Sequence, residues 1–154
     1  MKINNEIIYK PIGIIHTAFT EAKGTPIQAS VAKDTAGEIE IFEEYIEGLT
    51  DLEEYSHIIL LYHFHLTAKT GLLVKPFMDN QTHGVFSTRA PSRPNPIGIS
   101  TVRLIDILGN KLQIKDVDII DGTYLLDIKP FIPEFDLRDV KKTGWVKNNM
   151  YKLA

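Results

Sequence analysis

The sequence predicts a mainly β protein, a single-domain β-barrel with short helices and long loops. Short segments rich in β-branched or alternating apolar residues recur along the chain, separated by Gly, Pro, Asn and Asp, a pattern typical of closed or nearly closed β structures. The repeated helices of roughly ten or more residues that a doubly wound sheet requires are missing from the pattern. The length of 154 residues fits one domain, which at this size buries roughly two thirds of its unfolded surface.

Six strands follow from local patterns. Pro11 and Gly13 interrupt the first, which predicts an edge or bulged strand. The third has the strongest alternation: its even-numbered residues from 58 to 66 are apolar and should face the core. Gly109-Asn110 predicts the turn of a hairpin between the fourth and fifth strands. The expected strands span residues 7–15, 38–42, 56–66, 101–108, 111–120 and 123–128.

The remaining segments predict loops and short helices. Residues 17–35 contain few periodic apolar residues and include Gly24 and Pro26, which indicates a long loop. One helical turn is expected at residues 52–55 with Asp51 as its cap, and a short helix at 136–140.

Composition excludes several classes of protein. The chain has no cysteine, so disulfides, thiolate metal sites and a cysteine nucleophile are ruled out. The longest apolar run, residues 58–66, is far shorter than the roughly 17–25 residues of a membrane helix. The N-terminus shows no signal-peptide pattern, and we expect a cytoplasmic protein without membrane contact.

A net charge of −3 argues against a simple electrostatic nucleic-acid binder unless basic residues cluster on one face. The basic residues that could form such a surface are Lys10, Lys23, Lys69, Lys75, Arg89, Arg93, Lys141, Lys142 and Lys147.

Two histidines near the end of the third expected strand suggest a possible metal-binding site. His63 and His65 would share a strand face and could chelate a metal if His83 or Asp79 supplied a third ligand. The alternative, hydrogen bonding near a cleft or interface, is favoured because no acid-plus-histidine spacing accompanies the pair, so no metal is expected.

Residues 86–100 are the least ordinary segment. Three prolines, at 91, 94 and 96, exclude a helix and predict a stiff, extended loop. Such stiffness suits the fixed presentation of Arg89 and Arg93 to a carboxylate or phosphate. Gly98 would permit a close backbone approach or a positive φ. The alternative is a rigid structural loop with solvated arginines.

A second candidate site is Asp121-Gly122-Thr123, a predicted turn that would place a carboxylate, free amides and a hydroxyl close together. Further along the same strand, alternation puts Asp127 and Lys129 on one face with Leu125 as a possible exposed pair. The glycine-rich phosphate-binding fingerprints are missing from the sequence.

Together these motifs resemble the TsaA-like, or TrmO, family of tRNA adenine-N6 methyltransferases. The resemblance rests on Thr88-Arg89, the run from Arg93 through Asn95 to Ser100, Asp121-Gly122-Thr123 and the run 127–130, and it covers about residues 9–140. It implies a β-barrel domain over residues 1–140 with a C-terminal extension over 141–154, S-adenosylmethionine as cofactor, and a homodimer with the cofactor near the interface. The implied substrate is the threonylcarbamoyl-modified adenosine at position 37 of tRNA.

The resemblance also implies cofactor contacts, residue by residue. The sequence departs from the family at Ile27, Leu66 and Tyr124, where the family often has Arg, Gln and Pro. Contacts made there by the backbone would tolerate these changes, whereas contacts made by side chains would alter cofactor affinity or substrate choice. Arg93 and Asn95 would belong to the substrate or structural loop. The implied cofactor-binding residues are Pro26, Ile27, Gln28, His65, Leu66, Arg89, Ile99, Asp121, Gly122, Thr123 and Tyr124.

Methyl transfer from a sulfonium depends on positioning rather than on a protein nucleophile. We expect no essential strong base, because the N6 proton can leave after methylation, and Asp121 is the fallback base. Three alternatives stay open: a methyltransferase of a small molecule or another RNA, a cofactor-binding or sensor module without turnover, and a histidine metalloprotein.

Overall fold

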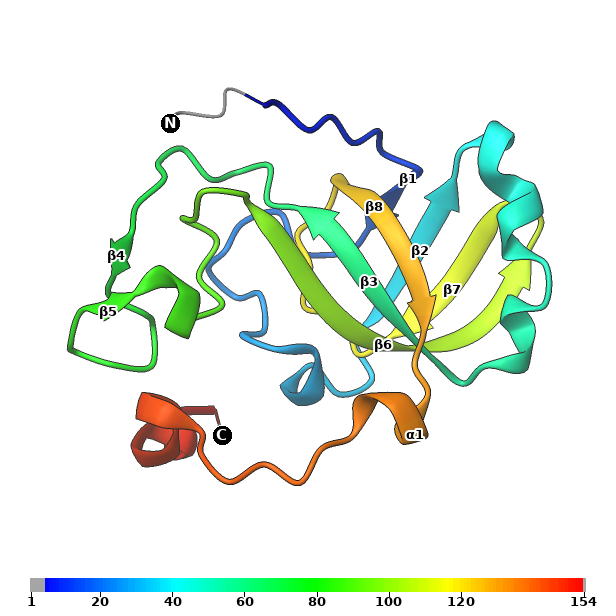
Figure 1. Ribbon diagram of the computed structural model, residues 1–154. Coiled ribbons are helices and arrows are strands. Elements are labelled where there is room, and N and C mark those ends of the chain that lie inside the picture. The colour runs from blue at the N-terminus through cyan, green and yellow to red at the C-terminus, as the bar shows by residue number, and fades with distance from the viewer. Residues whose placement is uncertain (1–4, 154) are drawn as a thin grey trace.

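The computed structural model describes residues 5–153 and confirms the predicted mainly β fold, because six antiparallel strands close into a barrel (Figure 1). Their order around the barrel is β1-β2-β7-β6-β3-β8, and β8 pairs with β1 to close the ring. The barrel strands are β1 (Gly13–His16), β2 (Ala36–Ile41), β3 (His57–His63), β6 (Ile97–Leu108), β7 (Lys111–Lys115) and β8 (Thr123–Pro130).

Aliphatic side chains fill the barrel by pointing inward at every second position. In β3, Ile58, Leu60 and Tyr62 are buried while their neighbours are partly exposed, which confirms the predicted core face. Burying each such aliphatic side chain contributes about 1.5–3 kcal/mol. The other fully buried barrel residues include Ile15, Ile39, Ile41, Val102, Leu112, Ile114 and Leu125.

A bulge in β8 changes which side chains share a face. Leu61 pairs with Asp127 but Tyr62 pairs with Leu125, so the register shifts by one residue between these pairs. The residues on either side of a bulge point to opposite faces. Leu125 is therefore buried in the core, whereas Asp127 lies outside and forms an ion pair with Lys129 at 2.8 Å. The predicted exposed pair is confirmed, but the prediction that Leu125 shares its face is wrong.

Strand ends differ from the predictions where turns or prolines intervene. Of the expected residues 7–15, only the last three fall in β1, because Pro11 has no N–H for a ladder. β3 ends at His63, so His65 lies beyond the strand. β7 stops at Lys115 because Asp116 adopts a positive φ of 67°. β6 begins at residue 97, inside the segment predicted to be a stiff loop.

The helices are short. α1 (Pro133–Asp136) precedes the predicted helix at 136–140, because proline is favoured at the first helical position. η3 (Leu52–Glu54) takes the place of the predicted turn at 52–55, but within residues 5–153 Asp51 forms no side-chain hydrogen bond that caps it. The sequence did not predict η2 (Glu43–Leu49), and η1 (Ala29–Val31) lies in the expected loop. Among the described residues, none of the helices combines the length and the apolar character needed to cross a bilayer.

Residues 64–96 leave the barrel between β3 and β6, and we call them the lobe. The lobe carries β4 (Leu73–Val74), β5 (His83–Gly84) and η4 (Val85–Ser87), and β4 pairs with β5 outside the barrel. Its position places the proline-rich segment where the chain re-enters the barrel (Figure 1).

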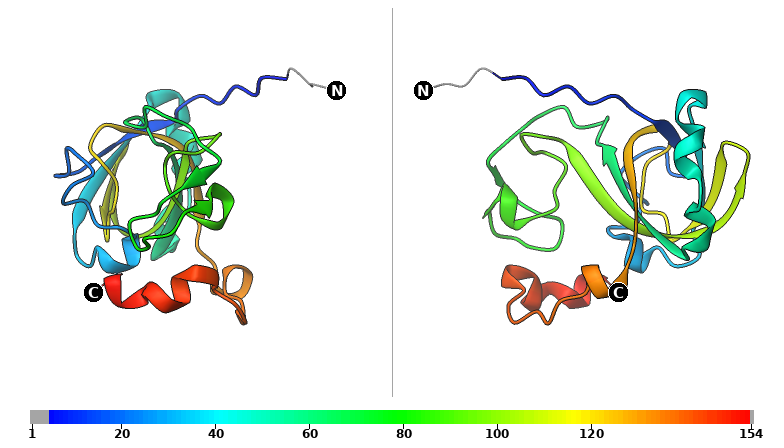
Figure 2. Two further views of the ribbon diagram at one scale, coloured as in Figure 1. Left: turned by 90° about the vertical axis from the view of Figure 1, so that its left-hand side faces the viewer. Right: turned by 45° about the vertical axis from the view of Figure 1, so that its right-hand side comes forward.

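Residues 138–153, which we call the C-terminal segment, pass below the lobe and end in η5 (Gly144–Leu153) (Figure 2). The Trp145 indole stacks on the His83 ring with centroids 4.9 Å apart, and its Nε1 donates to Ser87 O at 2.8 Å. Lys152 Nζ donates to Met78 O at 2.8 Å. These contacts attach the end of the chain to the lobe.

Candidate functional site

Arg93 braces the proline-rich segment from within. Its Nη1 donates to the carbonyl oxygens of Thr88 at 3.0 Å and Ala90 at 3.1 Å, and its side chain is partly buried. The carbonyl of Asn95 accepts from Ile97 N at 2.7 Å in a tight turn. These hydrogen bonds hold the segment from Thr88 to Arg93 in one conformation.

Gly98 is required by packing inside the protein. A Cβ at this position would lie 2.3 Å from Tyr62 Cε2 and 2.8 Å from Phe64 Cζ, which is closer than packed atoms can approach. The close backbone approach predicted at Gly98 is therefore to the Tyr62 ring, which fixes β6 against β3.

Arg89 and Gln28, both expected at the cofactor site, are in direct contact. Arg89 Nη1 donates to Gln28 Oε1 at 2.8 Å, although the residues are 61 positions apart. Both residues line two clefts. They share the smaller, of about 460 Å³, with Ile99, and the larger, of about 1100 Å³, with Ile27. Both volumes are in the range of small-molecule sites.

The carboxylate of Asp121 holds the chain that follows β1. Asp121 Oδ1 accepts from Thr17 N at 3.0 Å and lies 3.6 Å from His16 Nδ1. The carboxylate is about half exposed, so it remains accessible while it organises this turn.

The backbone amides of the same turn are not free, and that prediction is wrong. Asp121 N donates to Phe19 O at 2.7 Å, and Gly122 N donates to Ile15 O at 2.9 Å. Gly122 has a φ of 77°, the left-handed conformation that glycine adopts without strain. The turn therefore fastens β8 to the end of β1.

Thr123 links this turn to the end of β3. Its hydroxyl donates to Ile120 O at 2.6 Å and lies 3.3 Å from His65 Nδ1. Because the single hydroxyl proton goes to the carbonyl, the contact with His65 requires the proton on Nδ1.

The expected cofactor residues fall into two sets, one around the contact of Arg89 with Gln28 and one around the Asp121-Gly122-Thr123 turn. β3 ends at the end of the barrel where β6 and β8 begin (Figure 1). β3 lies between these two strands, and Tyr62 pairs with Gly98 on one side and with Leu125 on the other. The first set is Pro26, Ile27, Gln28, Arg89 and Ile99, and the second is His65, Leu66, Asp121, Gly122, Thr123 and Tyr124. At the departures Leu66 and Tyr124 the side chains are exposed.

A buried polar chain near the smaller cleft was missed by the sequence analysis. Ser100 Oγ donates to Asp118 Oδ1 at 2.5 Å, so Tyr62 OH is the donor in its 2.9 Å contact with Ser100 Oγ. Burial raises the pKa of Tyr62 well above its usual value, and the charge of Asp118 adds to the effect. Alternation had assigned Tyr62 to the core as an apolar residue, and nothing in the local pattern signalled these partners.

Arg103 forms a charged corner of the smaller cleft. Its Nε lies 2.6 Å from Asp116 Oδ2 and its Nη2 lies 2.5 Å from Asp34 Oδ1. Hydrogen bonding from Arg103 lowers the pKa of both carboxyls. Both aspartates have positive φ angles, of 63° and 67°, so two left-handed turns are tied to one guanidinium.

The residues of the metal hypothesis do not assemble. Within residues 5–153, no group of three or more His, Asp or Glu could hold a metal ion. His83 instead donates through Nε2 to Asp79 Oδ2 at 2.7 Å, and its ring stacks on Trp145. His65 contacts Thr123, which is the hydrogen-bonding alternative.

Similarity to known proteins decides the family of this chain. Residues 14–137 match the family described as tRNA-methyltransferase O N-terminal domain. The chain belongs to this TrmO family. It is 61% identical over 147 residues to a Pyrococcus abyssi protein named "Probable S-adenosyl-L-methionine-binding protein", covering 96% of this chain and 80% of that protein.

Two further relatives are named for a tRNA methyltransferase activity or as TrmO. A Mus musculus protein named tRNA (adenine(37)-N6)-methyltransferase is 36% identical over 84% of this chain and 32% of its own length. The crystal structure of TrmO from Pseudomonas aeruginosa superposes with a TM-score of 0.77 and 34% identity, over 92% of this chain and 63% of that one. The chain thus spans less than two thirds of these two longer members of the TrmO family.

Proposed function

We propose that this chain is an S-adenosylmethionine-dependent methyltransferase that methylates N6 of the threonylcarbamoyl-modified adenosine at position 37 of tRNA. Membership of the TrmO family supports the reaction class, and the name of the mouse relative supports the substrate. The observation that carries the proposal in this chain is the contact between Arg89 and Gln28 at the junction of two clefts.

The residues around this contact fit the cofactor. S-adenosylmethionine has a carboxylate, an ammonium group, a ribose and an adenine, and when bound it supplies a methyl group on a sulfonium for in-line displacement. The guanidinium of Arg89 has five N–H donors, and Gln28 accepts one of them. A charge-assisted bond from Arg89 to the carboxylate is among the stronger hydrogen bonds in proteins. Ile27 and Ile99 add apolar surface at the two clefts.

Positioning, rather than strong base catalysis, is the proposed contribution of the protein. The N6 proton can leave after methylation, and Asp121 already accepts a hydrogen bond from Thr17 N. We therefore expect Asp121→Asn to reduce turnover only severalfold. A loss of about 10²–10⁴ in turnover with unchanged cofactor affinity would instead identify Asp121 as a general base.

The decisive experiment is incubation with labelled S-adenosylmethionine and tRNA from cells that lack their own enzyme, followed by nucleoside analysis. Label should appear on N6 of the modified adenosine. Calorimetric titration should show that Arg89→Ala weakens cofactor binding about 10- to 100-fold, as expected for loss of a hydrogen bond to a charged group. The control is Arg138→Ala, because Arg138 is exposed and its guanidinium donates to Leu137 O, the carbonyl of the neighbouring residue.

A second candidate function is a cofactor-binding module without turnover, which the name of the Pyrococcus abyssi relative favours. It predicts tight binding of S-adenosylmethionine and no labelled nucleoside in any tRNA. Methylation of another RNA or of a small molecule would label a different product. Steep salt dependence of substrate binding would indicate an RNA.

The proposal includes a homodimer in the cytoplasm. Exposed apolar side chains at Ile97, Ile99 and Tyr124 lie on β6 and β8 on either side of β3, and burying such exposed apolar surface favours association. Light scattering during size-exclusion chromatography would report the mass in solution, and a monomeric mass at micromolar concentration would contradict the dimer.

A further inference from the structure

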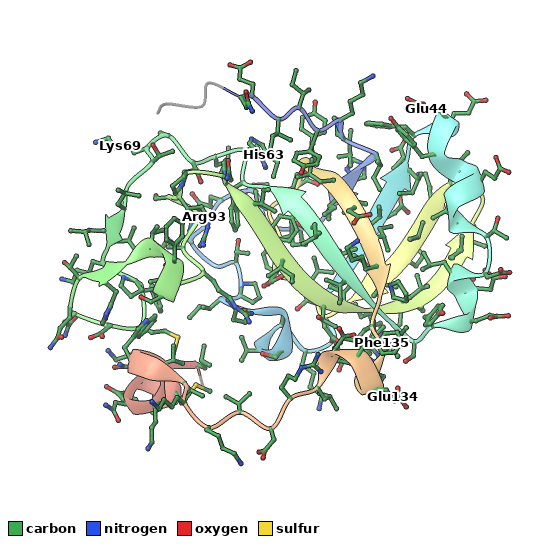
Figure 3. The ribbon with its side chains drawn as sticks, in the orientation of Figure 1. Glu44, His63, Lys69, Arg93, Glu134 and Phe135 are labelled. Atoms are coloured by element: carbon green, nitrogen blue, oxygen red, sulfur yellow. The ribbon has the colours of Figure 1, made fainter. Side chains whose placement is uncertain are left out.

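The lobe and the C-terminal segment are basic, whereas the rest of the molecule is acidic. The lobe and the C-terminal segment together contain nine lysines and arginines but only two aspartates, a net charge of +7. Since the whole chain carries −3, all other residues together carry −10. Lys69 and Arg93 lie on the side of the lobe, whereas Glu44 lies at the far end of the barrel (Figure 3).

Tertiary contacts turn two separate basic segments into one surface. The lobe ends at residue 96, and the C-terminal segment begins only at residue 138. The contacts of Trp145 with His83 and Ser87, together with the bond from Lys152 to Met78, hold the two segments side by side. Without these contacts the basic residues would be divided between a loop and a chain end.

Aromatic side chains project from the same surface. Phe77 is 82% exposed and Phe86 is 77% exposed, and both line the larger cleft with Trp145. Lys69 and Lys75 line this cleft too. Exposed aromatic rings interspersed with cations are the features on which unpaired bases stack while their phosphates are neutralised.

The larger cleft also reaches the proposed cofactor site. Its wall includes Ile27, Gln28 and Arg89 in addition to the lobe and the C-terminal segment. A nucleotide held on the aromatic surface would therefore lie in the same cleft as the residues proposed to bind S-adenosylmethionine.

We propose that the lobe and the C-terminal segment form a docking surface for the unpaired loop of an RNA. Bases stack on Phe77 and Phe86, and Lys69 and Lys75 neutralise phosphates at the same cleft. This inference rests on the proposed function, because the docked RNA is its substrate. It also explains how a chain of net negative charge can bind RNA: the acidic rest of the molecule repels the polyanion, and the basic docking surface attracts it.

Binding is measured by fluorescence anisotropy, without cofactor, on a labelled RNA stem-loop and on a fully paired RNA of equal length. The stem-loop should bind more tightly. Each of Phe77→Ala and Phe86→Ala should weaken stem-loop binding about 10- to 100-fold. The double variant Lys69→Ala/Lys75→Ala should reduce the slope of log K against log salt by about 1–1.5.

Matched controls separate these effects from fold and net charge. Lys111→Ala/Lys129→Ala changes the net charge equally but removes lysines outside the docking surface, which pair with Glu38 and Asp127. Phe135→Ala removes an exposed aromatic ring from α1. Both controls should bind the stem-loop as the wild type does, and all variants should keep the wild-type melting temperature within a few degrees.

The inference is overturned if the controls weaken binding as much as the docking-surface variants, or if duplex RNA or anionic lipid vesicles bind as tightly as the stem-loop. Failure of the proposed function would give a different set of results. The docking-surface variants would still weaken binding of the stem-loop, but no methyl group would be transferred or calorimetry would detect no S-adenosylmethionine binding.

Discussion

Replacing Gly98 with alanine tests the packing that fixes β6 against β3. The new Cβ would stand 2.3 Å from Tyr62 Cε2 and 2.8 Å from Phe64 Cζ, so the buried Tyr62 ring must move. Overpacking of this kind destabilises by about 1–3 kcal/mol. Movement of the ring also weakens the 2.9 Å contact between Tyr62 OH and Ser100 Oγ, a loss of about 0.5–1.5 kcal/mol. We expect a total destabilisation of about 2–4 kcal/mol and a melting temperature lower by about 5–15 °C.

Urea unfolding followed by circular dichroism measures this change. Gly84→Ala is the matched control, because the added Cβ would meet no atom of residues 5–153 within 4 Å and φ is −60°. The control should lie within about 1 kcal/mol of wild type. In a Tyr62→Leu background the effect of Gly98→Ala should shrink by at least about 1 kcal/mol. A Gly98→Ala variant as stable as Gly84→Ala would refute the steric explanation.

Two other substitutions probe the surroundings of the site. Arg103→Met should lower the melting temperature near pH 7. In the folded protein Arg103 lowers the pKa of Asp34 and Asp116 below the ordinary 3.8, and the resulting stabilisation is lost as the pH falls through these lowered pKa values. The difference in melting temperature between wild type and variant should therefore shrink below about pH 4. A difference that calorimetry finds independent of pH would contradict the ion-pair explanation. Thr123→Val should destabilise by about 1–3 kcal/mol, because it removes the proton that Ile120 O accepts at 2.6 Å. Thr123→Ser keeps the hydroxyl and loses only a buried methyl group, so it should be destabilised by about 1 kcal/mol, less than Thr123→Val, in the same denaturation assay. Equal stability of the two variants would exclude the hydroxyl as the cause.

The barrel class and its core face followed from alternation, because burial of one face imposes period two on each strand. Strand ends could not be obtained in this way. The early start of β6 inside a proline-rich segment depends on pairing with β3, and the bulge that sends Leu125 and Asp127 to opposite faces depends on the register with the same strand. The start of β6 and the bulge in β8 both depend on pairing with β3, so the residues of β6 and β8 themselves carry no pattern that predicts them.

The candidate site divides in the same way. The unusual run from Arg89 to Ser100 and the Asp121-Gly122-Thr123 turn were found in the sequence because their residue types are rare in such arrangements. Their partners were not found. Three sets of contacts join residues that are far apart in the chain. They are the contact of Arg89 with Gln28, the hydrogen bonds from the amides of Asp121 and Gly122 to Phe19 O and Ile15 O, and the buried hydrogen-bonded chain from Tyr62 through Ser100 to Asp118.

The sequence by itself determined the barrel class, the absence of cysteine chemistry and the motifs that mark the TrmO family, because residue type and spacing alone decide them. Only the tertiary structure decided which polar groups already form hydrogen bonds within the protein. It alone brought the basic lobe and the basic C-terminal segment together. The physical reason is that hydrogen bonds and electrostatic fields depend on distance in space, which strand pairing and the packing of Trp145 on His83 set.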